Sequence, residues 1–134
     1  MYFGYIQKKM AQHNQLGKWG EERACRYLEE QGYSIRERDF AINHKDLDIV
    51  AISPDETELV FIEVKTRTSD DFISPLQAIN RKKILNLLKA ANAYIQAEPR
   101  DYNIRFDIIT IVGTAEDNLR IEHIPDAFNP LLFI

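Results

Sequence analysis

Two apolar runs separated by only five residues place the strongest limit on how this chain can fold. Residues 47–53 (LDIVAIS) and 59–67 (LVFIEVKTR) have the length and apolar content of strands. The polar segment between them, residues 54–58 (PDETE), is a turn. Because so short a connection joins antiparallel neighbours, the sequence predicts a β-hairpin at the centre of the fold.

Apolar periodicity predicts the remaining elements. Strands are expected at residues 33–42, 47–53, 59–67, 104–112 and 119–124. A helix is expected over residues 16–31, where Gly32 is placed as a C-terminal cap, and residues 43–46 (NHKD) are a turn. A second helix of roughly 20 residues is predicted to begin at Ser74, because Ser74, Pro75 and Gln77 fit an N-cap, a first helical position and a capping box.

This order predicts an α/β fold in which helices flank a mixed sheet: helix, three strands, helix, two strands. No linker or repeat divides the chain, so residues 1–134 are expected to form a single domain, with residues 1–15 as a looser N-terminal segment.

Composition narrows the class of protein. The single cysteine, Cys25, cannot form an internal disulfide, and no apolar run approaches the roughly 20 residues needed to span a bilayer. We expect a cytoplasmic protein with no membrane partner. The net charge of −4 argues against coating nucleic acid by bulk charge, but it allows a local basic groove or a carboxylate cluster that binds a divalent cation.

Two charged residues interrupt the apolar strand at residues 59–67. Side chains two apart on a strand share a face, so Val60, Ile62 and Val64 point one way, while Glu63 and Lys65 point the other way. An unpaired charge on an interior strand is costly. Either the two residues neutralise each other, or their face meets solvent, or the pair has a chemical role.

The hairpin partner carries a further acid. Asp48 begins the preceding strand, and a suitable register would set its carboxylate beside Glu63. Facing carboxylates repel each other unless a proton or a cation lies between them, and oxygen ligands of this kind suit Mg²⁺ or Mn²⁺. The alternative interpretation is that Asp48 caps main-chain amides of a turn.

The two helices offer further candidates. Glu21 lies on the inward stripe of the first helix, so it is either a site residue or a first-turn acid favoured by the helix dipole. Gln77 either closes the capping box with Ser74 or has a role at the site. The basic residues of the second helix are expected on a solvated face that a phosphate backbone could also contact; they are Arg81, Lys82, Lys83 and Lys89.

The wider sequence resembles the YraN-type (UPF0102) family over residues 16–128. Five segments occur in the order of that family: LGKWGEERACRYLEEQGYSIRERDF, DLDIVA, LVFIEVKTRTSDDFISPLQAI, RFDIITI and HIPDAF. Its members are small bacterial proteins with a restriction-endonuclease-like fold, similar to archaeal Holliday-junction resolvases of the PD-(D/E)xK nuclease superfamily. Where the family usually has Gly-Glu-Ile-Asp, this chain has Lys45, Asp46, Leu47 and Asp48.

The resemblance implies a nuclease-type site. The helix glutamate of the family falls on Glu21, its hairpin aspartate on Asp48, and its acid–x–lysine pair on Glu63 and Lys65. We therefore expect a Mg²⁺- or Mn²⁺-dependent endonuclease acting on DNA, including branched or structured DNA. Asp48, Glu63 and the main-chain carbonyl of Val64 would hold the cation, and Glu21 would hold a second cation or a water.

Two alternatives stay open from the sequence. The first is a nuclease fold that binds nucleic acid without cutting it. The second is an interaction module, because the C-terminal segment NPLLFI is apolar and must dock either on its own domain or on a partner, which includes a second copy of the chain in a homodimer.

Overall fold

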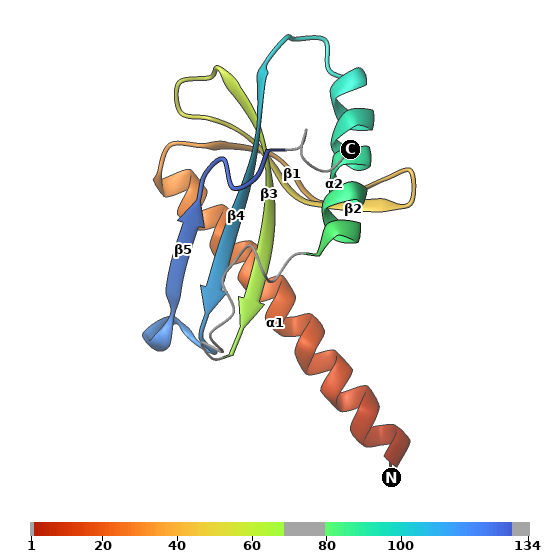
Figure 1. The fold of residues 1–134 in the computed structure, drawn as a ribbon. Helices are drawn as coiled ribbons and strands as arrows, with labels where there is room; N and C mark the ends of the chain where they lie inside the picture. The colour runs from red at the N-terminus through yellow and green to blue at the C-terminus, as the bar shows by residue number, and fades with distance from the viewer. Residues whose placement is uncertain (1, 69–79, 130–134) are drawn as a thin grey trace.

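The computed structural model describes residues 2–68 and 80–129, with side chains from residue 15 onward. Its elements follow the predicted order of helix, three strands, helix and two strands (Figure 1). They are α1 (Tyr2–Glu30), β1 (Ser34–Ile42), β2 (Lys45–Ile52), β3 (Glu58–Arg67), α2 (Arg81–Gln96), β4 (Asn103–Val112), the 3-10 helix η1 (Glu116–Asn118) and β5 (Arg120–Ile124).

The described strands form one mixed sheet in the order β1-β2-β3-β4-β5. Strands β3 and β4 are parallel, whereas the other neighbouring pairs are antiparallel. Alternate side chains of β3 divide the core into two layers. Leu59 and Phe61 pack with α2, while Val60, Ile62 and Val64 pack with α1, so the two helices cover opposite faces. The predicted α/β fold is confirmed.

The first helix begins at Tyr2, well before the predicted start at residue 16, and ends at Glu30. Its N-terminal part extends beyond the sheet in Figure 1. An apolar pattern reports only the part of a helix that packs, which is why the periodicity begins near residue 16. Gly32 has φ +96°, and the N–H of Tyr33 donates to the carbonyl of Leu28, so the predicted C-terminal cap is confirmed.

The second helix begins at Arg81, so the predicted start at Ser74 was wrong. Asn80 has an extended backbone conformation, and its side-chain oxygen accepts a 2.8 Å hydrogen bond from the N–H of Lys83. Asn80 is thus the N-cap, since a helix cannot pass through a residue in this conformation. The residues on which the earlier start was predicted, Ser74, Pro75 and Gln77, lie outside the described residues, as do residues 130–134 of the C-terminal segment.

The turn between β2 and β3 fixes the register of the central hairpin. The Oδ1 atom of Asp55 accepts hydrogen bonds from the hydroxyls of Ser53 (2.7 Å) and Thr57 (2.8 Å) and from the N–H of Thr57 (3.2 Å). The N–H of Ser53 donates to the carbonyl of Glu58, which closes the turn. The resulting pairs run from Ile52 with Leu59 to Ile49 with Ile62.

Close contact between α1 and β3 depends on Gly20. A Cβ atom at this position would overlap the hydroxyl of Thr66 and lie 2.9 Å from its Cβ atom. Gly17, one turn earlier, has no atom within 4 Å of the equivalent point. The helix can therefore lie against the end of β3 only because residue 20 has no side chain.

Replacing Gly20 by alanine should destabilise the protein, because the added methyl group must push α1 away from Thr66. We expect the free energy of unfolding to fall by about 1–3 kcal/mol. Gly17→Ala is the matched control, which should raise it by up to about 1 kcal/mol through helix propensity. Urea denaturation measures both values, and equal shifts in the two variants would contradict this account of the contact.

Candidate functional site

The register of the β2–β3 hairpin brings Asp48 and Glu63 together. The ladder ends with Ile49 opposite Ile62, so the next residues in register are Asp48 and Glu63. The Oδ2 atom of Asp48 accepts a 2.9 Å hydrogen bond from the N–H of Val64. Asp48 therefore satisfies a main-chain amide of the neighbouring strand β3, not one of a turn as the alternative interpretation held, and it still lies beside Glu63.

Glu63 is a buried carboxylate with incomplete compensation. Its side chain is 2 % exposed, and its Oε1 atom lies 3.5 Å from the ammonium nitrogen of Lys65 and 3.5 Å from that of Lys83. Among the described residues, its Oε2 atom has no hydrogen-bond partner although it is buried. A buried carboxylate oxygen without a partner is uncommon in folded proteins and calls for an explanation.

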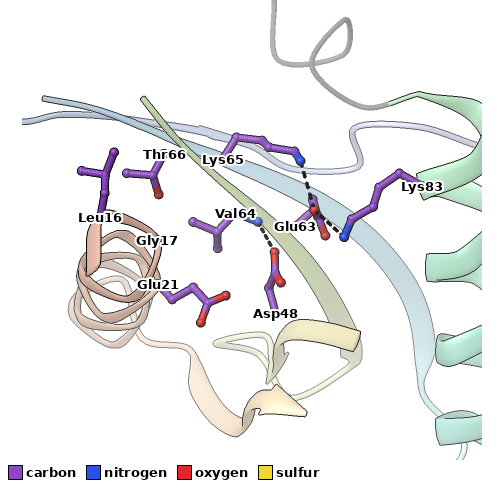
Figure 2. A pocket seen from close by; sticks show the side chains of 9 residues that line it. All are labelled: Leu16, Gly17, Glu21, Asp48, Glu63, Val64, Lys65, Thr66 and Lys83. Atoms are coloured by element: carbon purple, nitrogen blue, oxygen red, sulfur yellow. Dashed lines mark hydrogen bonds and ion pairs between the residues drawn. The ribbon is translucent and has the colours of Figure 1, made fainter. Parts of the chain in front are cut away.

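Glu21 reaches the same place from the opposite face of the sheet. It lies on the stripe of α1 that includes the buried residues Ala24, Cys25 and Leu28, as its helical position predicted. Figure 2 shows its carboxylate directed toward Asp48. The close approach of α1 at Gly20 places this acid at the end of the hairpin.

These groups line an open cavity of about 330 Å³, which we call the acidic cleft (Figure 2). The sequence-predicted residues Glu21, Asp48, Glu63, Val64 and Lys65 all lie along it. Its other lining residues are Leu16, Gly17, Thr66 and Lys83. The chain thus gathers, from three elements, acids that are far apart in the sequence.

The cleft changes the acidity of its carboxyl groups. Burial, together with the negative charge of Asp48, raises the pKa of Glu63 to about 7, although Lys83 and Lys65 act in the opposite direction. Burial and Asp48 also raise the pKa of Glu21 to about 7. Both carboxyl groups therefore hold protons near neutral pH when no cation offsets their charge.

Comparison with known proteins identifies the family. The model of "Uncharacterised protein family UPF0102" matches residues 20–111, more than half of the chain. The chain belongs to this family. UPF0102 proteins align with this chain along nearly their whole length. One from Bacteroides thetaiotaomicron is 49 % identical, and the alignment covers 92 % of this chain and 100 % of that protein. One from Syntrophomonas wolfei is 43 % identical, and the alignment covers 87 % of this chain and 99 % of that protein.

The carboxylates of this UPF0102 protein do not form a ready cage for a metal. Within residues 15–68 and 80–129, no three His, Cys, Asp or Glu side chains are grouped closely enough to hold an ion. Mg²⁺, however, is commonly held by one or two carboxylates, with waters and substrate oxygens completing its shell. The unpartnered Oε2 atom of Glu63, beside Asp48, fits a site of that kind.

Lys83 is the site residue that the sequence analysis missed. We expected it on the exposed face of α2, and the ion pair with Glu63 corrects this. Interaction with Glu63 and Asp48 raises its pKa, although burial acts against the charged form. The sequence carried a usable signal, because Lys83 lies four residues before Leu87 and seven before Ala90, both of which are buried.

A second buried carboxylate lies away from the cleft. Asp107 of β4 is fully buried, and its oxygens accept hydrogen bonds from Arg105 at 2.8 and 2.7 Å and from the N–H of Asp126 at 2.9 Å. His123 of β5 lies 2.7 Å from the same carboxylate. No local pattern in the sequence predicted this hydrogen-bond network.

No helix within the described residues is long and apolar enough to cross a membrane.

Removing the ionisable group of Glu21 should stabilise the protein at high pH. A carboxyl group whose pKa is raised by folding contributes its full stability below pH 4.5 and loses it as pH rises to about 7. The free energy of unfolding of Glu21→Gln should therefore rise relative to that of wild type between pH 4.5 and about 7. Above this range the variant should stay about 1 kcal/mol more stable, a value that allows for solvent screening of a half-buried group.

Urea denaturation in EDTA at several pH values measures the effect. Glu22→Gln is the matched control, because Glu22 is exposed and should give no such pH-dependent gain. A difference between Glu21→Gln and wild type that does not vary with pH would show that the folded state leaves the acidity of Glu21 unchanged.

Proposed function

We propose that this UPF0102 protein is a metal-dependent nuclease that hydrolyses phosphodiester bonds of DNA. The observation that carries the proposal is the state of Glu63: a 2 % exposed carboxylate, next to Asp48 in an open cleft, with one oxygen that has no hydrogen-bond partner among the residues that the structure describes. Burial of such a group is costly unless something compensates its charge. A divalent cation supplies that compensation.

Asp48, Glu63 and the main-chain carbonyl of Val64 are the groups that would hold the cation. When bound, Mg²⁺ or Mn²⁺ supplies Lewis-acid polarisation of the phosphate and lowers the pKa of water. The raised pKa values of Glu63 and Glu21 mean that metal binding is coupled to proton release, and hence is stronger at higher pH.

Three further side chains have roles in this proposal. Lys65 lies at the cleft with its ammonium group 3.5 Å from Glu63, where it can orient the attacking water and offset negative charge that develops on the phosphoryl oxygens. Lys83 adds a second positive charge from α2. Glu21, on the other side of Asp48, holds a water or a second cation.

DNA is proposed as the substrate because the fold and the acid–x–lysine pattern resemble those of Holliday-junction resolvases. The same resemblance favours branched or structured DNA. The cleft lies at the end of the central β2–β3 hairpin, where α1 contributes Glu21 from one face of the sheet and α2 contributes Lys83 from the other.

Isothermal titration with Mn²⁺ tests the metal site without any assumption about substrate. Wild type should bind the ion, and Asp48→Asn should weaken binding at least about tenfold, because the loss of one charged ligand costs well over 1 kcal/mol. The amide oxygen of asparagine can still accept the hydrogen bond from Val64. Asp46→Asn, a change of the same type two residues earlier, should bind like wild type.

Cleavage assays on labelled branched, flapped and duplex DNA with Mg²⁺ or Mn²⁺ test the activity. We expect Glu63→Gln and Lys65→Ala each to lower the rate by about 10²-fold or more, since the first removes a charged ligand of the cation and the second removes the positive charge beside the reacting phosphate. Lys82→Ala, on the exposed face of α2, should retain activity. Cleavage that survives both site variants comes from a contaminant and contradicts the proposal.

The same assay separates the proposal from its alternative. DNA that is bound by wild type but never cut, on the whole panel and with both ions, would assign the chain to the non-catalytic nucleic-acid-binding class. Cation binding in the titration would then still locate a metal site, but it would have a structural role.

A further inference from the structure

A second cavity, of about 170 Å³, adjoins the acidic cleft. We call it the hairpin pocket. It is lined by His44, Lys45, Asp46, Lys83, Asn86 and Leu87. Lys83 lines both cavities, so its side chain forms a common wall between them. The hairpin pocket therefore has two walls, the tip of the β1–β2 hairpin and the first turns of α2. These two segments lie close together in Figure 1.

The geometry of the hairpin tip is tightly defined. Asn43 and His44 have φ values of 51° and 61°, which is the signature of a two-residue turn, and Ile42 pairs with Lys45 on either side of it. On the helix, the N-cap bond from Asn80 holds the N–H of Lys83. Asn86 and Leu87 follow three and four residues later on the same face. The hydrogen-bond donors of the hairpin pocket are therefore held by regular secondary structure, the β1–β2 turn on one side and α2 on the other.

The two cavities differ in charge. The acidic cleft contains three carboxyl groups, whereas the hairpin pocket contains one, Asp46, against the ammonium groups of Lys45 and Lys83, the amide of Asn86 and the ring of His44. Hydrogen-bond donors therefore outnumber the one carboxylate of the hairpin pocket, and the charge of Lys83 is shared with Glu63 of the acidic cleft. Such a set favours an anion with several acceptor oxygens.

The size of the hairpin pocket limits what that anion can be. Its volume of about 170 Å³ has room for a phosphate group. A position next to the acidic cleft suits the phosphate that follows along the same strand.

We propose that the hairpin pocket binds the phosphate adjacent to the one that is cleaved, on the same DNA strand. Lys45, Asn86 and His44 are its donors, and Lys83 links the two sites. The inference rests on the proposed function, because it takes the acidic cleft as the place of cleavage. It assigns a positioning role to the β1–β2 turn.

Fluorescence anisotropy of a fluorescein-labelled oligothymidylate tests this site without any need for cleavage. Binding is measured with wild type, Lys45→Gln and Asp46→Asn, in EDTA and in Ca²⁺, over a range of salt concentrations. Lys82→Gln is the matched control, since Lys82 is exposed, lines neither cavity and loses the same charge.

Lys45→Gln should weaken binding roughly three- to tenfold and reduce the salt slope by about one phosphate contact. Asp46→Asn should tighten binding, because it removes the one carboxylate of the hairpin pocket. The opposite signs matter, since simple damage to the turn would weaken binding in both variants. Lys82→Gln should change affinity by less than about twofold.

Three results overturn the inference: equal effects of Lys45→Gln and Lys82→Gln, weaker binding by Asp46→Asn, or no binding by wild type in either EDTA or Ca²⁺. The failure of the proposed function looks different. If wild type never cuts DNA but the opposite signs are observed, the hairpin pocket is a phosphate site of a binding protein. If wild type cuts DNA but Lys45→Gln and Asp46→Asn do not change the affinity in opposite directions, only the inference about the hairpin pocket is contradicted.

Discussion

The carboxylate of Glu63 is the group on which the rest of the site depends. It lies in the middle of the sheet, 2 % exposed, where a charge costs several kcal/mol unless others offset it. Lys65 comes from the same strand and Lys83 from α2, each at 3.5 Å, and Asp48 adds repulsion from β2. The result is a carboxyl group whose pKa lies near neutral pH, so that it takes up a proton as the pH falls below about 7.

Two small features of the chain allow this site to form. The Asp55 turn sets the register that brings Asp48 beside Glu63, and a shift of one residue would turn the side chain of Asp48 to the other face of the sheet. Gly20 allows α1 to come close enough for Glu21 to reach the same end of the hairpin. An acidic group from α1 and a basic group from α2 therefore meet at the acidic cleft.

The meeting of Glu21, Asp48, Glu63 and Lys65 at one cleft was expected from the resemblance to the family. The sequence itself, through periods of two and 3.6 residues and one short turn, predicted the hairpin, the order of elements and the inward position of Glu21. It did not predict the start of α2, since Ser74 and Asn80 both resemble N-caps and local pattern cannot choose between them. Nor did it predict Lys83 at the site, because a lysine on a helix is ordinarily read as solvated. Asp107 and His123 come together because β4 pairs with β5. The spacing of residues within one segment does not reveal which strands are neighbours in the sheet.

Comparison of the two buried carboxylates within this one sheet separates structural from chemical roles. Burial alone would raise the pKa of Asp107, yet hydrogen bonds from His123, Arg105 and the N–H of Asp126 hold it below its ordinary value. Both oxygens of Asp107 are satisfied, so this acid stabilises the fold as it stands. Glu63 has longer ion pairs, a pKa raised to about 7, and one oxygen for which the described part of the chain offers no hydrogen-bond partner. The same chain compensates one buried carboxylate completely, so the incomplete compensation of Glu63, at the wall of an open cleft, is best explained by a ligand that completes it.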